Sequence, residues 1–462
     1  MRWDLTWCFL AVALGATLAT TGGCRTPRNG GKDGGSGSSG GGPGSGGSAG
    51  ALFPCIQDWP ARPQGTAKVA PLSVEPRILW TKALSSGVIG MAATGDGVAV
   101  SSGYTLLIYD GEGNLTASVA KPRPPPEPPG YISPPVTGKD GSVYFADSAN
   151  AYRVDAAGQP VWQKPLGPNQ SVGGEFGNGP GSPLLDGNGR LYVPALDGNL
   201  WILRSDDGQV VSSFQIGFKP GGLLPYVYFG TAAALFLDRT GVASAGPTVS
   251  AVGVLSAVTG AWLGEIAIGA GKYPPAVWPG YDIGIVVSGY VDLSGTREDS
   301  EAFVIDTCGR LRWRVPGSNA IPLAITFDDD LIVMDRIPLG GGAHSFALRR
   351  FSRDGALVAG PVAVADQFCG SFFVGADDTF YYTGGAADGY RLTAFDSSLR
   401  ELWTIPFPHC PDAAVLSSGG KIFTAKTVAN EFAAVQTTSP GPAPVSWSQG
   451  GGDARATRWL AP

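Results

Sequence analysis

The sequence predicts an all-β protein, an eight-bladed β-propeller built from four-stranded antiparallel blades and preceded by a disordered lipoprotein tether. Three observations support this prediction. A phrase of the form Asp-x-x-Gly-x-x-x-Trp recurs, its turn position returns every 42 to 52 residues, and each interval contains short β-type segments bounded by turn residues. A seven-bladed ring is the alternative, because the unit at 217–269 is irregular.

The phrase reads "DAAGQPVW" at 155–162, "DTCGRLRW" at 306–313 and "DSSLRELW" at 396–403. Asp and Gly at this spacing are typical of a tight turn, because Gly accepts positive φ and the Asp side chain bonds to nearby backbone amides. The turn position of successive repeats is occupied by Gly113, Gly158, Gly208, Gly260, Gly309, Gly355, Leu399 and Gly441.

Three short strands precede each turn. In the second repeat they read "YISPPVTG", "SVYFAD" and "AYRVD", rich in β-branched and aromatic residues. Each unit of about 45 residues is therefore a four-stranded sheet with two faces to cover. Sheets set radially around an axis cover one another, which favours a propeller over separate modules.

A tryptophan on the outermost strand of a blade is predicted to lie flat between neighbouring blades and to fill the gap there. Burial of such a ring removes about 150–250 Å² from water, which stabilises the fold by several kcal/mol. This structural role explains the repeated indole without a ligand. The residues assigned to blade docking are Trp80, Trp162, Trp262, Trp313 and Trp403.

Closing the ring requires the two ends of the chain to share a blade. The segment "PRILWTKAL" (76–84) has no blade strands before it, so it is predicted to supply the outer strand of a last blade whose other strands lie within 412–437. The segment 441–462 is then surplus and either competes for the same edge or lies outside. Whether the strand of Trp80 or that of Trp447 closes the ring stays open.

The N-terminus carries a targeting pattern. Residues 1–23 are predicted to be a signal peptide, and "TGGC" (21–24) resembles a lipobox that ends in a lipidated Cys24. Residues 24–52 form a Gly/Ser-rich linker that cannot bury enough apolar surface to order itself. The propeller is assigned to 53–440 and a C-terminal tail to 441–462. By resemblance to bacterial lipoprotein sorting, Arg25 after the cysteine implies the outer membrane, facing the periplasm or the cell surface, and plain secretion is the alternative.

Composition argues against several kinds of function. The net charge is −6, whereas nucleic-acid binding requires a basic face. Only two histidines occur, so no catalytic, cofactor-binding or metal-ligating residue is assigned and no cofactor is expected. The acidic stretches "FDDDL" (327–331) and "GADDT" (375–379) lack the spacing of a calcium loop and are predicted to be solvated turns.

The four cysteines after Cys24 suggest disulfides, because an even number in an exported chain is typical of a disulfide framework. Three pairings of Cys55, Cys308, Cys369 and Cys410 are possible. Cys369 and Cys410 precede the first strands of consecutive blades, where equivalent loops approach each other. This pair is therefore the favoured disulfide.

The repeated phrase, together with "AVTGAW" (257–262), resembles the repeat of the PQQ-like (quinoprotein) β-propellers over about residues 76–447. Within that family the chain resembles the BamB-type outer-membrane lipoprotein propellers, which implies a non-catalytic role. PQQ-dependent dehydrogenases of the family imply an adjacent cysteine pair and a calcium ligand set. No Cys-Cys dipeptide occurs in this sequence.

The expected function is that of a non-catalytic envelope lipoprotein. Its propeller would bind envelope or outer-membrane proteins as a scaffold, in outer-membrane protein assembly, with a lipid anchor in the membrane and no nucleic-acid partner. A ligand- or polysaccharide-binding adhesion module is the first alternative, and a PQQ-dependent dehydrogenase is the second. The fold by itself does not choose among them.

Overall fold

The structure is a computed structural model, and it describes the propeller region of the chain. The described residues are 53–56, 59, 67–84, 87–120, 132–147, 149–166, 183–186, 188–195, 198–216, 227–231, 234–238, 249–270, 276–292, 298–317, 319–340, 343–364, 367–386, 389–411, 413–426, 430–443 and 459–460. The predicted signal peptide, Cys24 and the Gly/Ser linker lie outside these residues.

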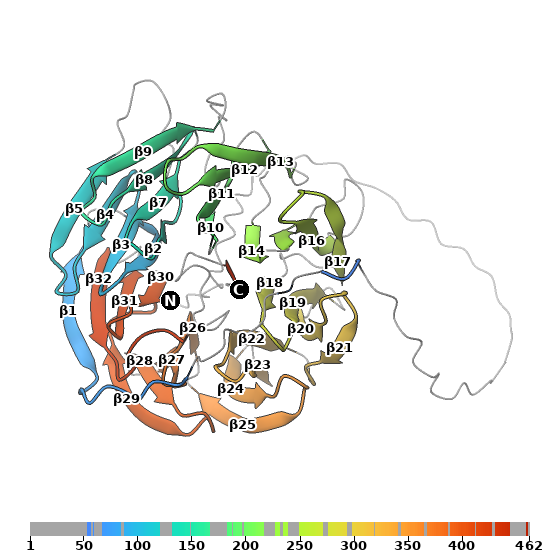
Figure 1. The fold of residues 1–462 in the computed structure, drawn as a ribbon. Coiled ribbons are helices and arrows are strands. Elements are labelled where there is room, and N and C mark those ends of the chain that lie inside the picture. The colour runs from blue at the N-terminus through green and yellow to red at the C-terminus, as the bar shows by residue number, and fades with distance from the viewer. Residues whose placement is uncertain are drawn as a thin grey trace, which may run out of the picture. The chain divides into compact units, whose positions relative to one another are not determined.

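Eight antiparallel sheets stand around a common axis, as Figure 1 shows. Each blade has four strands, and its first strand is the one nearest the axis. Blade 4 has a fifth strand, which comes from the C-terminal segment. The part of the chain that the structure describes contains strands and turns but no helix. The predicted eight-bladed propeller is confirmed, and the seven-bladed alternative is wrong.

Blades 1 to 4 take their strands in chain order, and each strand pairs with the next. Their bounds are β2 (Val88–Thr94), β3 (Gly97–Ser102), β4 (Thr105–Tyr109) and β5 (Leu115–Ala120) in blade 1; β6 (Val136–Thr137), β7 (Val143–Ala146), β8 (Asn150–Val154) and β9 (Pro160–Pro165) in blade 2; β10 (Leu184–Leu185), β11 (Arg190–Pro194), β12 (Asn199–Arg204) and β13 (Val210–Gln215) in blade 3; and β14 (Val227–Thr231), β15 (Ala234–Asp238), β16 (Val249–Ser256), β17 (Trp262–Ala270) and the added β33 (Trp459–Leu460) in blade 4.

Blades 5 to 7 follow the same order, and blade 8 combines three late strands with the first strand of the chain. Their bounds are β18 (Ala276–Pro279), β19 (Ile285–Asp292), β20 (Glu298–Ile305) and β21 (Leu311–Arg314) in blade 5; β22 (Ala320–Ile325), β23 (Leu331–Gly340), β24 (Ala343–Phe351) and β25 (Leu357–Val364) in blade 6; β26 (Gln367–Val374), β27 (Phe380–Ala386), β28 (Gly389–Phe395) and β29 (Glu401–Phe407) in blade 7; and β30 (Ala413–Leu416), β31 (Lys421–Lys426), β32 (Glu431–Gln436) and β1 (Arg77–Ala83) in blade 8.

The ring closes where β1 pairs with β32. The register places Trp80 opposite Ala434 and Lys82 opposite Phe432, so the first strand of the chain completes the last blade. The sequence left the closing strand open, and the structure shows that the strand of Trp80 pairs with the last blade. Trp447 lies outside the described residues.

The Asp-x-x-Gly phrase forms the turn between the third and fourth strands of a blade. The amide of Gly158 donates to the carbonyl of Asp155 at 2.9 Å. Asp155 Oδ1 accepts from the amides of Ala157 and Gln159 at 2.9 and 2.8 Å. Gly158 has φ 78°, a left-handed conformation that glycine adopts at little cost. The same pair of carboxylate bonds recurs at Asp110, Asp306 and Asp396.

The turn glycine also leaves room for an aromatic ring of the preceding blade. A β-carbon placed on Gly113 would lie 2.6 Å from the ring of Trp80, and one placed on Gly355 would lie 2.8 Å from the ring of Trp313. Neither distance fits a real carbon–carbon contact, so these turns exclude any side chain. The repeated phrase therefore specifies a contact between blades. The tryptophan side chain of one blade packs over the turn glycine of the next.

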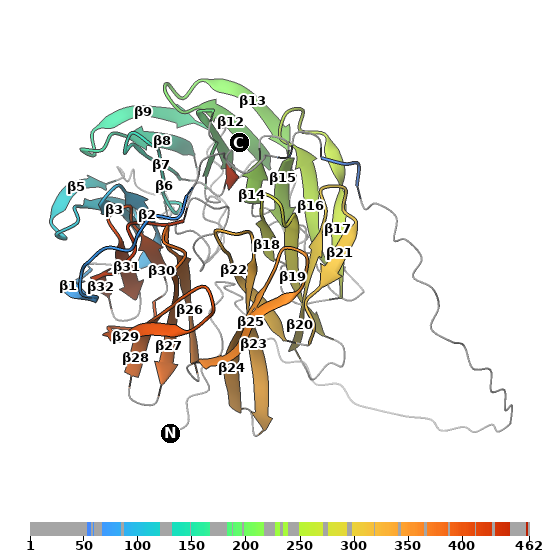
Figure 2. The same ribbon diagram turned by 60° about the horizontal axis from the view of Figure 1, so that its bottom comes forward.

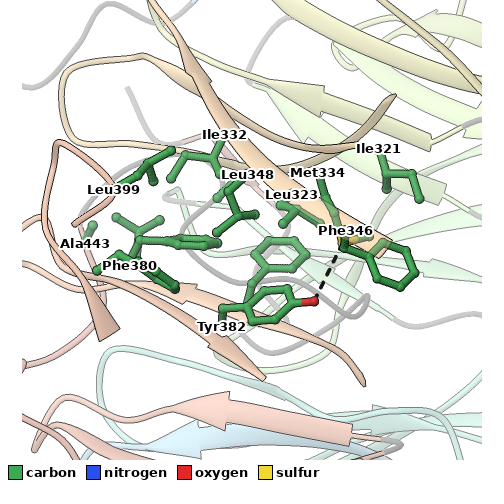
Figure 3. Close-up of a cluster of buried hydrophobic side chains, with 14 of the residues drawn as sticks. Ile321, Leu323, Ile332, Met334, Phe346, Leu348, Phe380, Tyr382, Leu399 and Ala443 are labelled. Carbon is green, nitrogen blue, oxygen red and sulfur yellow. Dashed lines mark hydrogen bonds between the residues drawn. The ribbon is translucent and has the colours of Figure 1, made fainter. Parts of the chain in front are cut away.

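The hydrophobic core is divided among the gaps between neighbouring blades. Figure 3 shows the gap between blades 6 and 7, where Met334 and Phe346 lie beside Tyr382, and Phe380 lies toward Ala443. The hydroxyl of Tyr382 donates to the sulfur of Met334 at 3.9 Å. Ala443, beyond the last blade strand, is buried in the same cluster. Each blade thus depends on its neighbours for the cover of its faces.

Candidate interaction surfaces

The described part of the chain holds no group of three or more His, Cys, Asp and Glu that could bind a metal ion. It also contains no helix long and apolar enough to cross a membrane. The surfaces that carry distinctive features are the two faces of the ring and the inner edge of blade 4.

Three of the five predicted docking tryptophans share one geometry. The indole Nε1 of Trp162 donates to the carbonyl of Ser205 at 3.0 Å, in the turn of the next blade. Trp313 Nε1 donates likewise to Arg353 at 3.0 Å. Trp80 Nε1 lies 3.4 Å from the carbonyl of Gly111. The hydrogen bond and the ring contact together fix the angle between neighbouring blades.

Trp403 and Trp262 are placed differently. Trp403 packs against Tyr381 at 5.7 Å between centroids, but its buried Nε1 has no hydrogen-bond partner among the described residues. The next blade is blade 8, whose outer strand comes from the N-terminus, so the chain forms no turn there to offer a carbonyl. Trp262 begins β17, two residues before the docking position, and is 48% exposed. Gly264 occupies that position in blade 4.

The structure joins the cysteines in two disulfides, Cys369 with Cys410 and Cys55 with Cys308. The first is the favoured pair, although Cys369 lies within β26 of blade 7 instead of before it, while Cys410 lies in the loop that enters blade 8. The second fixes a residue before β1 to the turn between the third and fourth strands of blade 5. Sequence reasoning left this second pairing open, because Cys55 precedes every blade strand.

The turn face of the ring is the face formed by the turns between first and second strands and between third and fourth strands. A segment that we call the strap, described at 53–56, 59 and 67–76, binds to it. The amide of Ile56 donates to Thr307 at 2.8 Å, and the amide of Val69 donates to Ala376 at 2.9 Å. Leu72 then bonds to Thr438 at 2.6 Å, directly before β1. The strap therefore contacts blades 5, 7 and 8 before its chain closes the ring.

The strap is anchored by apolar side chains at its beginning. Phe53 and Ile56 are 3% and 6% exposed and belong to the core cluster shared by blades 4 and 5. Trp59 packs edge-on against Phe236, and its Nε1 donates to the carbonyl of Gly280 at 3.1 Å. Burial of these side chains makes the strap part of the folded body.

Both acidic stretches form turns as predicted, but they are solvated only in part. Asp328 is 51% exposed, whereas Asp329 and Asp378 are buried, and the turns belong to an ion network beneath the strap. Lys68 of the strap binds Asp328 at 2.8 Å and Asp378 at 2.9 Å. Arg350 binds Asp330 at 2.8 Å and lies 3.7 Å from Asp378. The side chains of Arg350 and Asp378 are only 4% and 3% exposed. The pattern of acidic residues gave no sign of these basic partners, which are distant in sequence.

The ion network shifts the titration of its members. Burial acts to lower the pKa of Lys68, but hydrogen bonds to Asp328 and Asp378 outweigh it, so the pKa is raised above the ordinary 10.5. Its stabilising effect is complete below pH 10.5 and is lost only as the pH rises through the folded value. Burial raises the pKa of Asp330, although the Arg350 guanidinium acts in the opposite direction. The strap lysine therefore remains charged at neutral pH.

Two aspartates of these turns also connect blades to each other. Asp329 and Asp378 occupy the same turn position in blades 6 and 7, both with φ 64°. The amide of Ile283 in blade 5 donates to Asp329 at 3.0 Å. The amide of Phe327 in blade 6 donates to Asp378 at 3.2 Å. Each carboxylate thus binds the preceding blade, which explains why an unfavourable left-handed conformation is retained.

The opposite face, which we call the hairpin face, carries the turns between second and third strands. Its hairpins are uneven in length. Strands β23 and β24 have 10 and 9 residues, whereas β7 and β8 have 4 and 5. Figure 2 shows β23 and β24 of blade 6 extending past their neighbours. The long strands β19 and β20 lie in the adjacent blade 5.

The blade 6 hairpin has a fixed base and an apolar end. Near its base, Arg349 forms an ion pair with Asp335, donates to the carbonyl of Pro316 at 2.8 Å and lies over the ring of Phe351. Toward the end of β23, Ile337 and Leu339 are 44% and 64% exposed. Residues 337 and 339 are two apart along β23, so both exposed aliphatic side chains lie on one face of the strand.

Comparison with known proteins finds likeness in fold. No family model and no curated sequence matches this chain. Among solved structures, BamB from Moraxella catarrhalis is 13% identical, with TM-score 0.38 over 76% of this chain and 85% of that chain. The C-terminal WD40 domain of Sif2 is 11% identical, with TM-score 0.53 over 80% and 99%. The Dos1 propeller is 11% identical, with TM-score 0.54 over 78% and 95%. The chain thus shares the β-propeller fold with the Sif2 and Dos1 propellers.

Proposed function

We propose that this chain is a non-catalytic lipoprotein of the cell envelope whose propeller binds proteins through the hairpin face. Cys24 would carry the lipid, and the Gly/Ser-rich residues after it would hold the propeller clear of the outer membrane. The partners would be components of outer-membrane protein assembly. Two disulfides support an oxidising compartment outside the cytoplasm.

The observation that carries the proposal is the difference between the two faces of the ring. The strap covers turns of blades 5 to 8 on the turn face, and the Cys55–Cys308 disulfide fixes where the N-terminal segment meets that face. The hairpin face carries no such cover among the described residues and presents Ile337 and Leu339.

A pull-down from detergent-solubilised outer membrane tests this function. The bait variant Ile337→Ser/Leu339→Ser removes both exposed aliphatic side chains of the blade 6 hairpin. The matched control, Val161→Ser/Leu402→Ser, removes two aliphatic side chains that are each 46% exposed on the outer rim. We expect the wild type and the control to recover barrel-assembly components, and the hairpin variant to lose them by about tenfold or more.

Equal recovery by the hairpin variant would refute the assigned face, and absence of assembly components from the wild-type eluate would refute the assigned partners. Envelope polysaccharide in that eluate would support the adhesion alternative. The anchor is tested separately with Cys24→Ser, which should move the protein from the membrane fraction to the soluble fraction. Dye reduction after addition of PQQ and calcium would support the dehydrogenase alternative and contradict a non-catalytic role.

A further inference from the structure

The C-terminus adds a strand to the inner edge of blade 4. Strand β33 (Trp459–Leu460) pairs in parallel with β14 (Val227–Thr231), with Gly230 opposite Trp459 and Thr231 opposite Leu460. Every other sheet in the described part of the chain has four strands. In Figure 1 this short strand lies near the centre of the ring, beside the C mark. The innermost strand of blade 4 is therefore an edge that accepts another strand.

The innermost strand of a blade can accept another strand, because the backbone groups that point toward the axis have no partner within the blade. Amide and carbonyl groups along an edge bond readily to an extended chain, and the affinity comes mainly from the main chain. The pairing seen with β33 is parallel, which differs from every pairing within the blades. An incoming chain of any sequence that can extend would make the same backbone bonds.

The pairing between β33 and β14 is short and is not needed to close the ring. It involves two residue pairs, whereas ring closure by β1 and β32 involves six. So few bonds gain little over the entropy lost on ordering the segment. The segment is nevertheless tethered, because residues 444–458 connect it to Ala443 in the core between blades 6 and 7. Such a tether gives an effective concentration on the order of a millimolar.

We propose that the inner edge of β14 is a peptide-binding site, which takes an extended polypeptide segment by parallel strand addition. The chain's own C-terminal segment occupies this edge until an incoming segment displaces it. This inference rests on the proposed function as a binding scaffold and specifies the partner: an unfolded or extended stretch of protein. The hairpin face would dock a folded surface, whereas the β14 edge would hold an extended one.

The test uses a fluorescent peptide with the sequence of residues 453–462, "DARATRWLAP". Its binding is measured by anisotropy against the full mature chain in detergent and against a truncated chain that ends at Gly452. We expect the truncated chain to bind the peptide about tenfold or more tightly than the full chain, because the tethered competitor is gone. Thermal unfolding of both chains serves as the folding control, and their midpoints should agree because β33 does not close the ring.

Two further reagents make the result specific. A peptide with proline at the positions of Trp459 and Leu460 lacks the backbone donors of the added strand and should not bind. A full-length Thr231→Cys/Leu460→Cys variant, oxidised to hold the segment in place, should bind no peptide, and its reduction should restore the wild-type affinity.

The proposal is overturned if truncation does not strengthen binding, or if the proline peptide binds as well as the unmodified one. Either result would leave the pull-down on the hairpin face unaffected, since that experiment alters a different part of the ring. Loss of partners by the hairpin variant together with no peptide binding would therefore refute this site alone.

Discussion

The indole of Trp162 occupies the space that a side chain on Gly208 would need. A β-carbon built on Gly208 would lie 2.9 Å from the ring, and the glycine has φ 70°. Both the space and the backbone conformation therefore require glycine. The contact joins blade 2 to blade 3, and equivalent contacts join other neighbours around the ring.

Gly208→Ala should destabilise the protein by about 2–4 kcal/mol, from left-handed strain and from displacement of the indole. Gly95→Ala is the matched control, because Gly95 has φ 67° but nothing lies within 4 Å of its added β-carbon. The control should lose only about 1 kcal/mol. Denaturant unfolding measures both. Equal losses would mean that the indole contact contributes nothing.

The two tryptophans at equivalent positions in blades 2 and 7 should respond differently to removal of the indole N–H. Trp162→Phe loses the bond to Ser205 and part of the ring, so a loss of about 2 kcal/mol is expected. Trp403→Phe removes a buried N–H donor that has no partner, which is favourable. This gain offsets the loss of buried surface from the smaller ring, so the free energy of unfolding should change by no more than about 1 kcal/mol. Thermal and denaturant unfolding compare them. A larger loss for Trp403→Phe would contradict the account of blade 8.

The ion network under the strap predicts unequal costs for its two basic residues. Lys68→Met should cost about 1 kcal/mol or less, because Lys68 is 41% exposed and Asp378 keeps Arg350 nearby. Arg350→Met should cost about 3 kcal/mol or more, because it leaves Asp330 without its closest basic partner and removes a second positive charge from beside the buried Asp378. The free energies of unfolding of both variants are measured at neutral pH and low salt. Similar losses for Lys68→Met and Arg350→Met would contradict a buried network around Arg350.

Alkaline pH should destabilise the ring through its buried tyrosines. Burial raises the pKa of Tyr192 to about 12, so the folded state keeps a proton that the unfolded state loses above pH 10. The unfolded state then binds fewer protons, and stability falls as the pH rises from 10 through 12, by at most about 3 kcal/mol for this group. Tyr192→Phe should reduce the slope of unfolding free energy against pH in that range. An unchanged slope would show that Tyr192 titrates normally.

The propeller could be predicted from the sequence because the residues that specify each blade lie close together in the chain and recur in every repeat. The turn position of each phrase marks one blade, and the lone strand around Trp80 marks the closing edge. Leu399 shows how a departure is absorbed: it takes the place of a turn glycine at φ 59°, and the preceding blade has Ala359 at the position that is tryptophan in blades 2, 5 and 7. Both residues belong to one buried cluster, so a larger turn residue is matched by a smaller neighbour.

The strap could not be predicted, because its bonds join residues far apart in a segment without β periodicity. Lys68 and Asp378 are separated by 310 residues, and neither stands in a recognisable motif. The same limit applies to Cys55 with Cys308 and to the strand added by the C-terminus. Trp262 was assigned to docking from its residue type, but its place two residues early in the strand leaves it half exposed.

The Cys55–Cys308 bond decides where a pulling force would enter the ring. Tension on the N-terminal segment would pass through the sulfur atoms into blade 5, sparing the hydrogen bonds of the strap and of β1. Without that bond the same tension would peel the strap and then β1, opening the circle at blade 8. An optical-trap measurement should therefore give a much lower opening force under reducing conditions, and equal forces would show that the pull takes another route.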